Sequence, residues 1–358
     1  MIGMATISGD NSNSSMVTGA PIEMTLHQAP FAPVKIGVVG LGNFGSLHAS
    51  TLAGLAEADL VALVDRREDR LHGISGQFPD VAGWTDLDRA IAESEAEAWV
   101  VASSTASHVP LTNKLLDAGH TVLLEKPIAE SLADAQSLAP LVDTDSSNLM
   151  LGHLILFNSE FRQLTDEVAQ RGPIHYIDCV RHRPTETLAN FPGETPFYLT
   201  MVHDLYLVLV LANRAEPSGF SAQTHRTLDG ACDLALAQLQ WPDGRLASLA
   251  ASFLTPESMA KDGFDRMEVF GAGWTARIRA NPRPFEIWDE QARWPLTLEL
   301  RSEGAAPSGM LAEELRCFCR VVRGQQAVPM GATYHDAMQV QGWIDRLEDC
   351  VTNPGPAR

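Results

Sequence analysis

The chain contains 358 residues, with 26 lysines and arginines against 45 aspartates and glutamates, so its formal net charge is −19. Nucleic acids and anionic membranes attract an excess of positive charge, and this balance therefore argues against either as a general partner. The length suggests two domains. The 5 cysteines show neither zinc nor disulfide spacing, which is typical of reduced thiols in a cytoplasmic protein. No spacing of His, Cys and carboxylate residues indicates a metal site.

The first segment, residues 1–30, is predicted to be a disordered tail. It is rich in Ser, Thr, Asn, Met and Gly, and the first basic residue is Lys35. A secretory leader needs a positive start and a compact apolar core, so we expect no leader here. No stretch of the chain approaches the roughly 18 consecutive apolar residues of a membrane helix.

Residues 31–156 alternate between two periodicities. Short, nearly all-apolar runs predict parallel strands buried on both faces, at 35–39, 60–64, 99–102 and 121–124, with another within 149–157. Helical spacing separates them, at 44–56, 67–77, 86–93, 108–118 and 131–142. Strands that alternate with helices indicate an α/β domain with a doubly wound parallel sheet, whose ligands bind at the carboxyl ends of the strands.

Residues 157–358 follow a different pattern, which predicts a second domain of the α+β class. Partial period-2 alternation predicts strands at 174–182, 232–241, 245–254, 264–270 and 274–279. Two pairs of these strands flank turn sequences, Pro242-Asp243-Gly244 and Gly271-Ala272-Gly273, as in antiparallel hairpins. Helices near 308–323 and 334–350 close the chain.

A glycine-rich motif, Gly40-Leu41-Gly42-Asn43-Phe44-Gly45, directly follows the first predicted strand and opens a predicted helix. The first glycine suits a tight turn, the second lets the backbone approach a pyrophosphate, and the third lets the helix pack on the strand. Asp65 ends the next strand, where a carboxylate accepts hydrogen bonds from ribose hydroxyls. Together these features predict a dinucleotide-binding site.

The identity of the nucleotide is less well determined. Asp65 favours NAD, because its negative charge would repel a 2′-phosphate. Arg66 and Arg67 follow at once, and an arginine at this position can instead bind that phosphate, so NADP stays open. An S-adenosylmethionine enzyme can show the same glycines and acid.

Glu125-Lys126-Pro127 ends another predicted strand of the same sheet. A lysine at this edge lies over the ligand crevice. Pro127 biases the residue before it toward an extended backbone and so helps to fix the direction of the Lys126 side chain. A lysine in this place is hard to reconcile with a methyltransferase.

These motifs and several others occur in the order found in the Gfo/Idh/MocA family (glucose–fructose oxidoreductase, inositol dehydrogenase and their relatives), which the chain resembles over about residues 34–350. The others are Ser104-Thr105-Ala106-Ser107-His108, Ala118-Gly119-His120, Gly152-His153 and His203-Asp204. The resemblance implies a Rossmann domain followed by a domain with a large open, mostly antiparallel sheet, which binds substrate and often forms a homodimer or homotetramer interface.

The resemblance also implies NAD(P)-dependent hydride transfer at a secondary alcohol of a sugar, cyclitol or sugar nucleotide. Lys126 then contacts the reacting hydroxyl and the cofactor, and His203 acts as acid and base. A histidine titrates near neutral pH, which suits a general base, and a lysine cation can stabilise a developing alkoxide. The residues expected at the cofactor are Gly40, Gly42, Asn43, Phe44, Gly45, Asp65, Arg66, Ser104, His108, Glu125 and Lys126.

The substrate half departs from the family pattern. Leu199 and Tyr206 stand where aspartates are common around the histidine, and Leu156 and Ser159 replace a usual arginine and proline. The substrate is therefore expected to be unusual and less polar, or catalysis to be weakened. The alternative function is an NAD(P)-binding regulator with little turnover. Candidate substrate residues are His153, Asn158, Arg181, Tyr198 and Asp204, and the run 183–196 is predicted to be a loop over the pocket in which Arg181 or Arg183 binds a phosphate or carboxylate.

Overall fold

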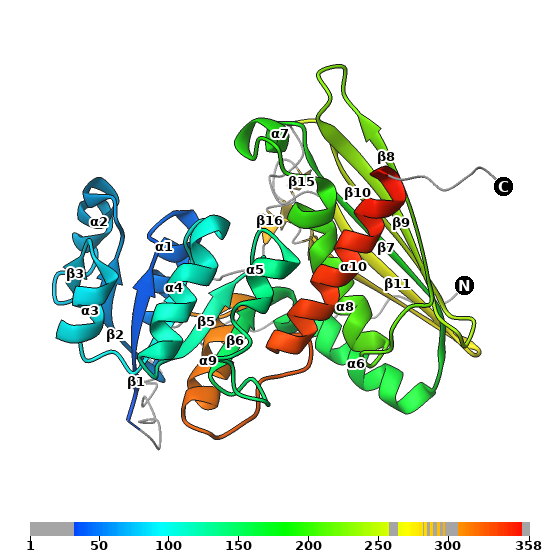
Figure 1. The fold of residues 1–358 in the computed structure, drawn as a ribbon. Helices are drawn as coiled ribbons and strands as arrows, with labels where there is room; N and C mark the ends of the chain where they lie inside the picture. Colours follow the sequence, from blue (N-terminus) through cyan, green and yellow to red (C-terminus); the bar gives the residue numbers. More distant parts are fainter. Residues whose placement is uncertain are drawn as a thin grey trace, which may run out of the picture.

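A computed structural model describes residues 32–257, 264–281, 283–284, 287–288, 292–293, 296–297 and 307–352. The predicted tail, residues 1–30, lies outside the described residues. Two six-stranded sheets organise the described part of the chain, and helices lie beside each of them (Figure 1).

The first sheet is the predicted doubly wound parallel sheet, with strand order β3-β2-β1-β4-β5-β6. Its strands are β1 (Val34–Val39), β2 (Ala58–Val64), β3 (Ala82–Trp84), β4 (Ala98–Val101), β5 (Thr121–Glu125) and β6 (Leu149–Gly152), and every pairing is parallel. The order reverses between β1 and β4, which is where such sheets bind their ligands. Strand β3 was not predicted, because it is short and two of its three residues are exposed.

Helices connect these strands as the periodicity predicts. They are α1 (Asn43–Leu52), α2 (Glu68–Ser75), α3 (Leu87–Glu93), α4 (Thr105–Asp117) and α5 (Leu132–Gln136). The helix expected over 131–142 ends early, and the strand expected within 149–157 ends at Gly152, where a 3₁₀ turn, η1 (Leu154–Phe157), begins.

The second sheet has the order β12-β11-β7-β10-β9-β8 and is mostly antiparallel, as expected. Its strands are β7 (Ile174–Pro184), β8 (Gly219–Arg226), β9 (Cys232–Gln240), β10 (Leu246–Thr255), β11 (Phe264–Gly271) and β12 (Trp274–Asn281). Only the central β7–β10 pair of this sheet is parallel. Two short two-stranded ladders follow, β13 (Arg283–Pro284) with β16 (Leu296–Thr297) and β14 (Ile287–Trp288) with β15 (Ala292–Arg293).

The remaining helices follow β6 in the chain. They are α6 (Ser159–Arg171), α7 (Glu186–Asn190), a π-helical turn η2 (Phe197–Met201), α8 (Val202–Leu211), α9 (Met310–Val322) and α10 (Tyr334–Thr352). Helix α10 packs on α8 and β8, whereas α9 returns to the first sheet and packs on α1 and η1 (Figure 1). The segment 183–196, expected to be a loop, contains the short helix α7. Among the described residues, no helix is long and apolar enough to cross a membrane.

Candidate active site

The glycine motif forms the predicted turn between β1 and α1. Gly40 has φ +90°, and a Cβ there would lie 2.6 Å from the backbone of Ser103. A Cβ on Gly45 would overlap the carbonyl oxygen of Gly40. At Gly42, by contrast, a Cβ would meet only Arg70, 3.8 Å away. The first and third glycines are therefore needed for the turn itself, and the second faces open space in front of the helix N-terminus, where a pyrophosphate binds.

Asp65 holds this turn from the end of β2. Its buried carboxylate accepts hydrogen bonds from the backbone N–H groups of Leu41 (2.8 Å) and Arg67 (2.9 Å). The acid is thus fixed beside the glycine turn, as a group that recognises ribose hydroxyls must be.

Three arginines surround Asp65, and only two of them were considered from the sequence. Arg66 is exposed, and Arg67 is held by an ion pair with Asp69. The third, Arg70, reaches back from α2, with Nη1 3.9 Å from Asp65 Oδ2 and close to Gly42. An exposed arginine at this place is a candidate contact for the nucleotide phosphates. Its position one helical turn beyond Arg66 was the available signal.

Replacing Gly42 with alanine tests the turn without disturbing the fold. Gly42 has φ −69°, and its added methyl group would meet no backbone atom. We expect an unchanged melting temperature and an affinity for the dinucleotide at least about 10-fold lower, because the methyl group points where the pyrophosphate approaches. Calorimetric titration with NAD and NADP measures this, and unchanged affinity would contradict the assignment of the turn.

Helix α4 begins beside the glycine turn. Ser104, its N-cap residue, and Asn43, the first residue of α1, are exposed, whereas Phe44 is half-buried and packs edge-to-face on His48. His108 is buried, and its ring nitrogens lie 2.7 Å from the Pro127 carbonyl oxygen and 3.2 Å from that of Ser103. These contacts join α4 to the segment after β5, so His108 is a positioning residue.

Glu125 and Lys126 lie at the end of β5, and Lys126 precedes a cis peptide bond to Pro127. Glu125 is buried and its Oε1 lies 2.8 Å from His48 Nε2. Burial lowers the pKa of Lys126 below its usual value, and the nearby charge of Glu125 opposes this shift. An ammonium group with a lowered pKa gives up its proton more readily than that of an exposed lysine.

His203 is the second residue of α8 and is half-buried. Burial lowers its pKa well below the usual value, and the positive charge of Lys126 adds to this effect. The structure therefore brings these two side chains, 77 positions apart in the chain, close enough for one charge to act on the other. A neutral imidazole beside a cation is able to accept a proton.

The π-helical turn η2 immediately precedes α8, on which His203 lies, and π turns occur frequently at functional sites. Leu199, which replaces a common aspartate of the resembled family, lies within this turn.

His153 follows β6 and lies close to the same pair. Its ring stacks on Tyr206, with ring centroids 3.3 Å apart, and neither ring nitrogen has a hydrogen-bond partner. Burial, with the charge of Lys126 adding to it, lowers the pKa of His153 to about 3, so the ring is neutral. The Tyr206 ring, at a position where the resembled family commonly has an aspartate, thus packs directly against His153.

Arg181 and Asp204, two candidate substrate residues, bind each other instead. Arg181 donates to both carboxylate oxygens of Asp204 (2.8 and 3.1 Å) and to Asp265 (2.7 Å), and all three side chains are buried. Burial alone would lower the pKa of Arg181, but the two carboxylates raise it above its usual value. Arg183 also donates to Asp265 (2.7 Å). Arg181, Arg183, Asp204 and Asp265 thus form one network of ion pairs.

The last two candidates point to other partners. Asn158 is fully buried and caps α6, its side-chain oxygen accepting from the N–H groups of Glu160 (2.9 Å) and Phe161 (3.0 Å). The Tyr198 hydroxyl donates to Asp345 of α10 (3.1 Å). Glu194, which sequence analysis did not single out, raises the pKa of Lys126, so the segment before η2 approaches the site.

The fold and this site define a class of protein: an oxidoreductase with an NAD-binding Rossmann domain. Residues 34–153 match the sequence profile described as "Oxidoreductase family, NAD-binding Rossmann fold". These residues match the Gfo/Idh/MocA family, and the relatives described below are dehydrogenases. The open cradle at Gly42 and the fixed Asp65 carboxylate fit the dinucleotide.

Individual relatives differ in how much of the chain they match. This chain is 24% identical to 4-carboxy-2-hydroxymuconate-6-semialdehyde dehydrogenase of Sphingobium sp. over 304 residues. The match covers 80% of this chain and 96% of that protein. The chain is 31% identical to inositol 2-dehydrogenase 1 of Saccharopolyspora erythraea over 181 residues, 49% of this chain and 53% of that protein. The crystal structure of scyllo-inositol dehydrogenase from Lactobacillus casei, with bound NAD(H) and scyllo-inositol, superposes with a TM-score of 0.77 at 20% identity, covering 90% of this chain and 98% of that chain. At this identity the structural likeness shows the shared fold.

Proposed function

We propose that the protein transfers hydride between NAD or NADP and a secondary alcohol or ketone of a sugar, cyclitol or sugar nucleotide, with Lys126 and His203 as the acid/base pair. The observation that carries the proposal is that Lys126, directly after β5, lies close enough to His203, at the start of α8, for its charge to lower the pKa of the imidazole. The nicotinamide cofactor supplies the hydride acceptor or donor.

Lys126 holds the reacting oxygen in this proposal. Its buried ammonium group donates a hydrogen bond to the hydroxyl and stabilises the alkoxide that forms as the proton leaves. Glu125 and Glu194 favour the charged form of this ammonium group, because both carboxylates raise the pKa that burial lowers.

His203 takes the proton from the hydroxyl and returns it in the reverse direction. Its lowered pKa keeps it neutral at pH 7, which leaves a ring nitrogen able to accept a proton. His153, stacked on Tyr206 and also neutral, offers a hydrogen bond to a neighbouring hydroxyl of the substrate. Arg181 and Asp204 act as positioning residues that hold β7 against the start of α8.

A second candidate substrate is a hydroxylated or aldehyde compound that carries a carboxylate. The charges of Arg181 and Arg183 both act on Lys126, and Leu199 and Tyr206 occupy positions at which the family commonly has aspartates. Without aspartates at those two positions the site carries less negative charge, which favours an anionic substrate. One relative, which matches 80% of this chain, is named for a carboxylated semialdehyde.

A substrate panel distinguishes these candidates. The purified protein is incubated with NAD or NADP and with inositols, sugars, sugar nucleotides and carboxylated hydroxyaldehydes, and formation of the reduced cofactor is followed by absorbance. Turnover of neutral polyols supports the first candidate, and turnover of carboxylated compounds alone supports the second. If the cofactor binds and no compound is oxidised, the proposal is wrong and the regulatory alternative is favoured.

The pH dependence of kcat/KM reports on both groups. His203 must be unprotonated to accept a proton, and its pKa lies well below 6.5, so we expect no loss of oxidation rate on lowering the pH to 6.5. Lys126 must be protonated, and its pKa lies below 10.5, so the rate is expected to fall at a pH below that value. Steady-state kinetics over this range measure both limits, and a rate that already falls between pH 7.5 and 6.5 would contradict the role of His203.

A further inference from the structure

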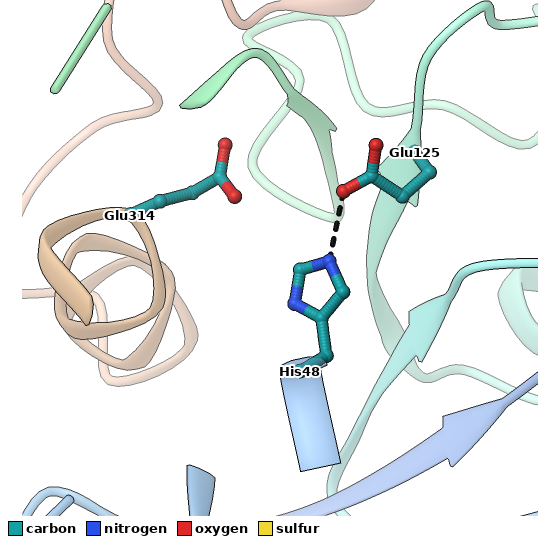
Figure 2. Close-up of side chains that lie close together, drawn as sticks. All are labelled: His48, Glu125 and Glu314. Carbon is teal, nitrogen blue, oxygen red and sulfur yellow. Dashed lines mark hydrogen bonds and ion pairs between the residues drawn. The ribbon is translucent and has the colours of Figure 1, made fainter. Parts of the chain in front are cut away.

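Three buried side chains from distant parts of the chain converge behind the active site (Figure 2). They are His48 on α1, Glu125 at the end of β5 and Glu314 on α9, and one ligand atom from each lies within 4.8 Å of the others. His48 and Glu314 have no solvent-exposed surface and Glu125 is 6% exposed. We call these residues the His48 cluster.

Within the part of the chain that the structure describes, Glu314 has no partner that accounts for its burial. Neither carboxylate oxygen of Glu314 has a hydrogen-bond donor among the described residues, and Nδ1 of His48 also has no partner there. The other ring nitrogen, His48 Nε2, lies 2.8 Å from Glu125 Oε1 and forms a hydrogen bond with it. Figure 2 shows the Glu314 carboxylate directed toward the space between that pair. A buried carboxylate without donors is costly, because the group loses its hydration and gains nothing in exchange.

The charges of the cluster are also unbalanced. Lys126 acts on Glu125 and offsets its charge. Glu314 is influenced only by burial and by the negative charge of Glu125, with no cation among its neighbours in the described part of the chain. A proton on Glu314 would cancel its charge and give it an O–H group to donate to Glu125, but the other oxygen would remain buried without a partner. A divalent cation would satisfy the oxygens and the charge together.

We propose that the His48 cluster binds a divalent transition-metal ion of the Zn²⁺ type, ligated by His48 Nε2 and by one carboxylate oxygen each of Glu125 and Glu314. Imidazole nitrogen with two carboxylate oxygens is a ligand set that Zn²⁺ accepts, at about 2.0–2.2 Å for each ligand. The ligand atoms of a tetrahedral site with these bond lengths lie about 3.4 Å apart, so His48 Nε2 and Glu125 Oε1, now 2.8 Å apart, would separate slightly, and the Glu314 carboxylate would move toward them.

The site would be structural. The Nε2 to Glu125 hydrogen bond gives way to the two metal bonds, and the ring proton then resides on Nδ1. Glu125 Oε2 still accepts from the backbone N–H of Lys126 (3.2 Å). The ion would thereby join the cofactor helix α1, the lysine at the end of β5 and helix α9.

Metal binding to the full-length protein tests the proposal without any assay of activity. The protein is dialysed against a chelator, titrated with Zn²⁺ and separately with Co²⁺, and examined by metal analysis, by the visible spectrum of Co²⁺ and by thermal unfolding. We expect one ion per chain, ligand-field bands of a site with one nitrogen and two carboxylates, and a higher melting temperature. No binding by the unmodified chain would overturn the proposal.

Glu314→Gln is the specific variant and Glu313→Gln its matched control. Glu313 lies on the same helix but is half-buried and pairs with Arg316 at 2.7 Å, outside the cluster. We expect Glu314→Gln to bind at least about 10-fold more weakly, and Glu313→Gln to bind like the parent. Equal affinity in both would place the metal elsewhere and overturn the proposal. If Glu314→Gln does not fold, His48→Gln and the Co²⁺ spectrum of the parent decide the question in the same way.

Discussion

Replacing Lys126 with methionine is expected to lower kcat/KM by at least about 100-fold, because the variant lacks the cation that stabilises the alkoxide. Cofactor affinity is expected to stay within a few-fold of the parent, since Asp65 and the glycine turn are unchanged. Steady-state kinetics with the substrate found in the panel and calorimetric titration with NAD measure the two quantities. Lys114→Met is the control, because it removes an exposed lysine of α4 that forms an ion pair with Asp88.

The same variant carries a second signature that a merely structural lysine would not give. Lys126 lowers the pKa of His203, so its removal raises that pKa toward the usual value. The acid limit of the residual activity should then move to higher pH, and a limit that stays in place would argue against the pairing. His203→Gln should abolish this limit and lower turnover about 100-fold or more, whereas His72→Gln on the exposed side of α2 should leave both unchanged.

Replacing Asp204 with alanine is expected to destabilise the protein by about 3–5 kcal/mol, because Arg181 would remain buried with Asp265 as its single acidic partner. Urea unfolding followed by tryptophan fluorescence measures the change in the free energy of unfolding.

The double variant Arg181→Met with Asp204→Leu is the matched control. It removes both charges together, so its loss of stability should be smaller than that of Asp204→Ala alone. A loss of less than about 1 kcal/mol in the single variant would show that water or another group compensates Arg181.

The fold was predictable where the chain carries local signals. Apolar runs ending in glycine, and turns such as 242–244, located most strands of both sheets, because each strand needs a period or a breaker that a short window contains. Strands β3 and β8 were not predicted. Strand β3 is short and largely exposed, and β8 is partly exposed, so neither shows a clear apolar pattern. Helix α7 escaped because it is short and buries none of its residues.

The position of a site residue could be predicted where that residue directly follows a strand of the parallel sheet. Gly40, Asp65 and Lys126 all follow strands, so their place at the ligand crevice follows from the topology. Arg181 and Asp204 were assigned to the substrate because the sequence does not reveal that an arginine on β7 and an acid on α8 face each other.

The polar groups with non-local partners were missed for the same reason. Tyr206 contacts His153, and Glu314 lies near His48. In each pair the two residues are far apart in the chain, and no sequence spacing indicates that they meet. Only the assembled packing of α8 and α9 reveals these contacts.

The return of α9 to α1 has a consequence for exchanging parts between relatives. A chimaera that joins the first 156 residues of one homologue to the remainder of another would place a foreign α9 against its own α1 and η1. Such a chimaera therefore needs two crossover points in the sequence, one before and one after the strands of the second sheet. Residues 310–322 would then come from the parent that supplies the nucleotide-binding half. Such a double crossover would let specificity be transplanted while the packing around His48 stays native.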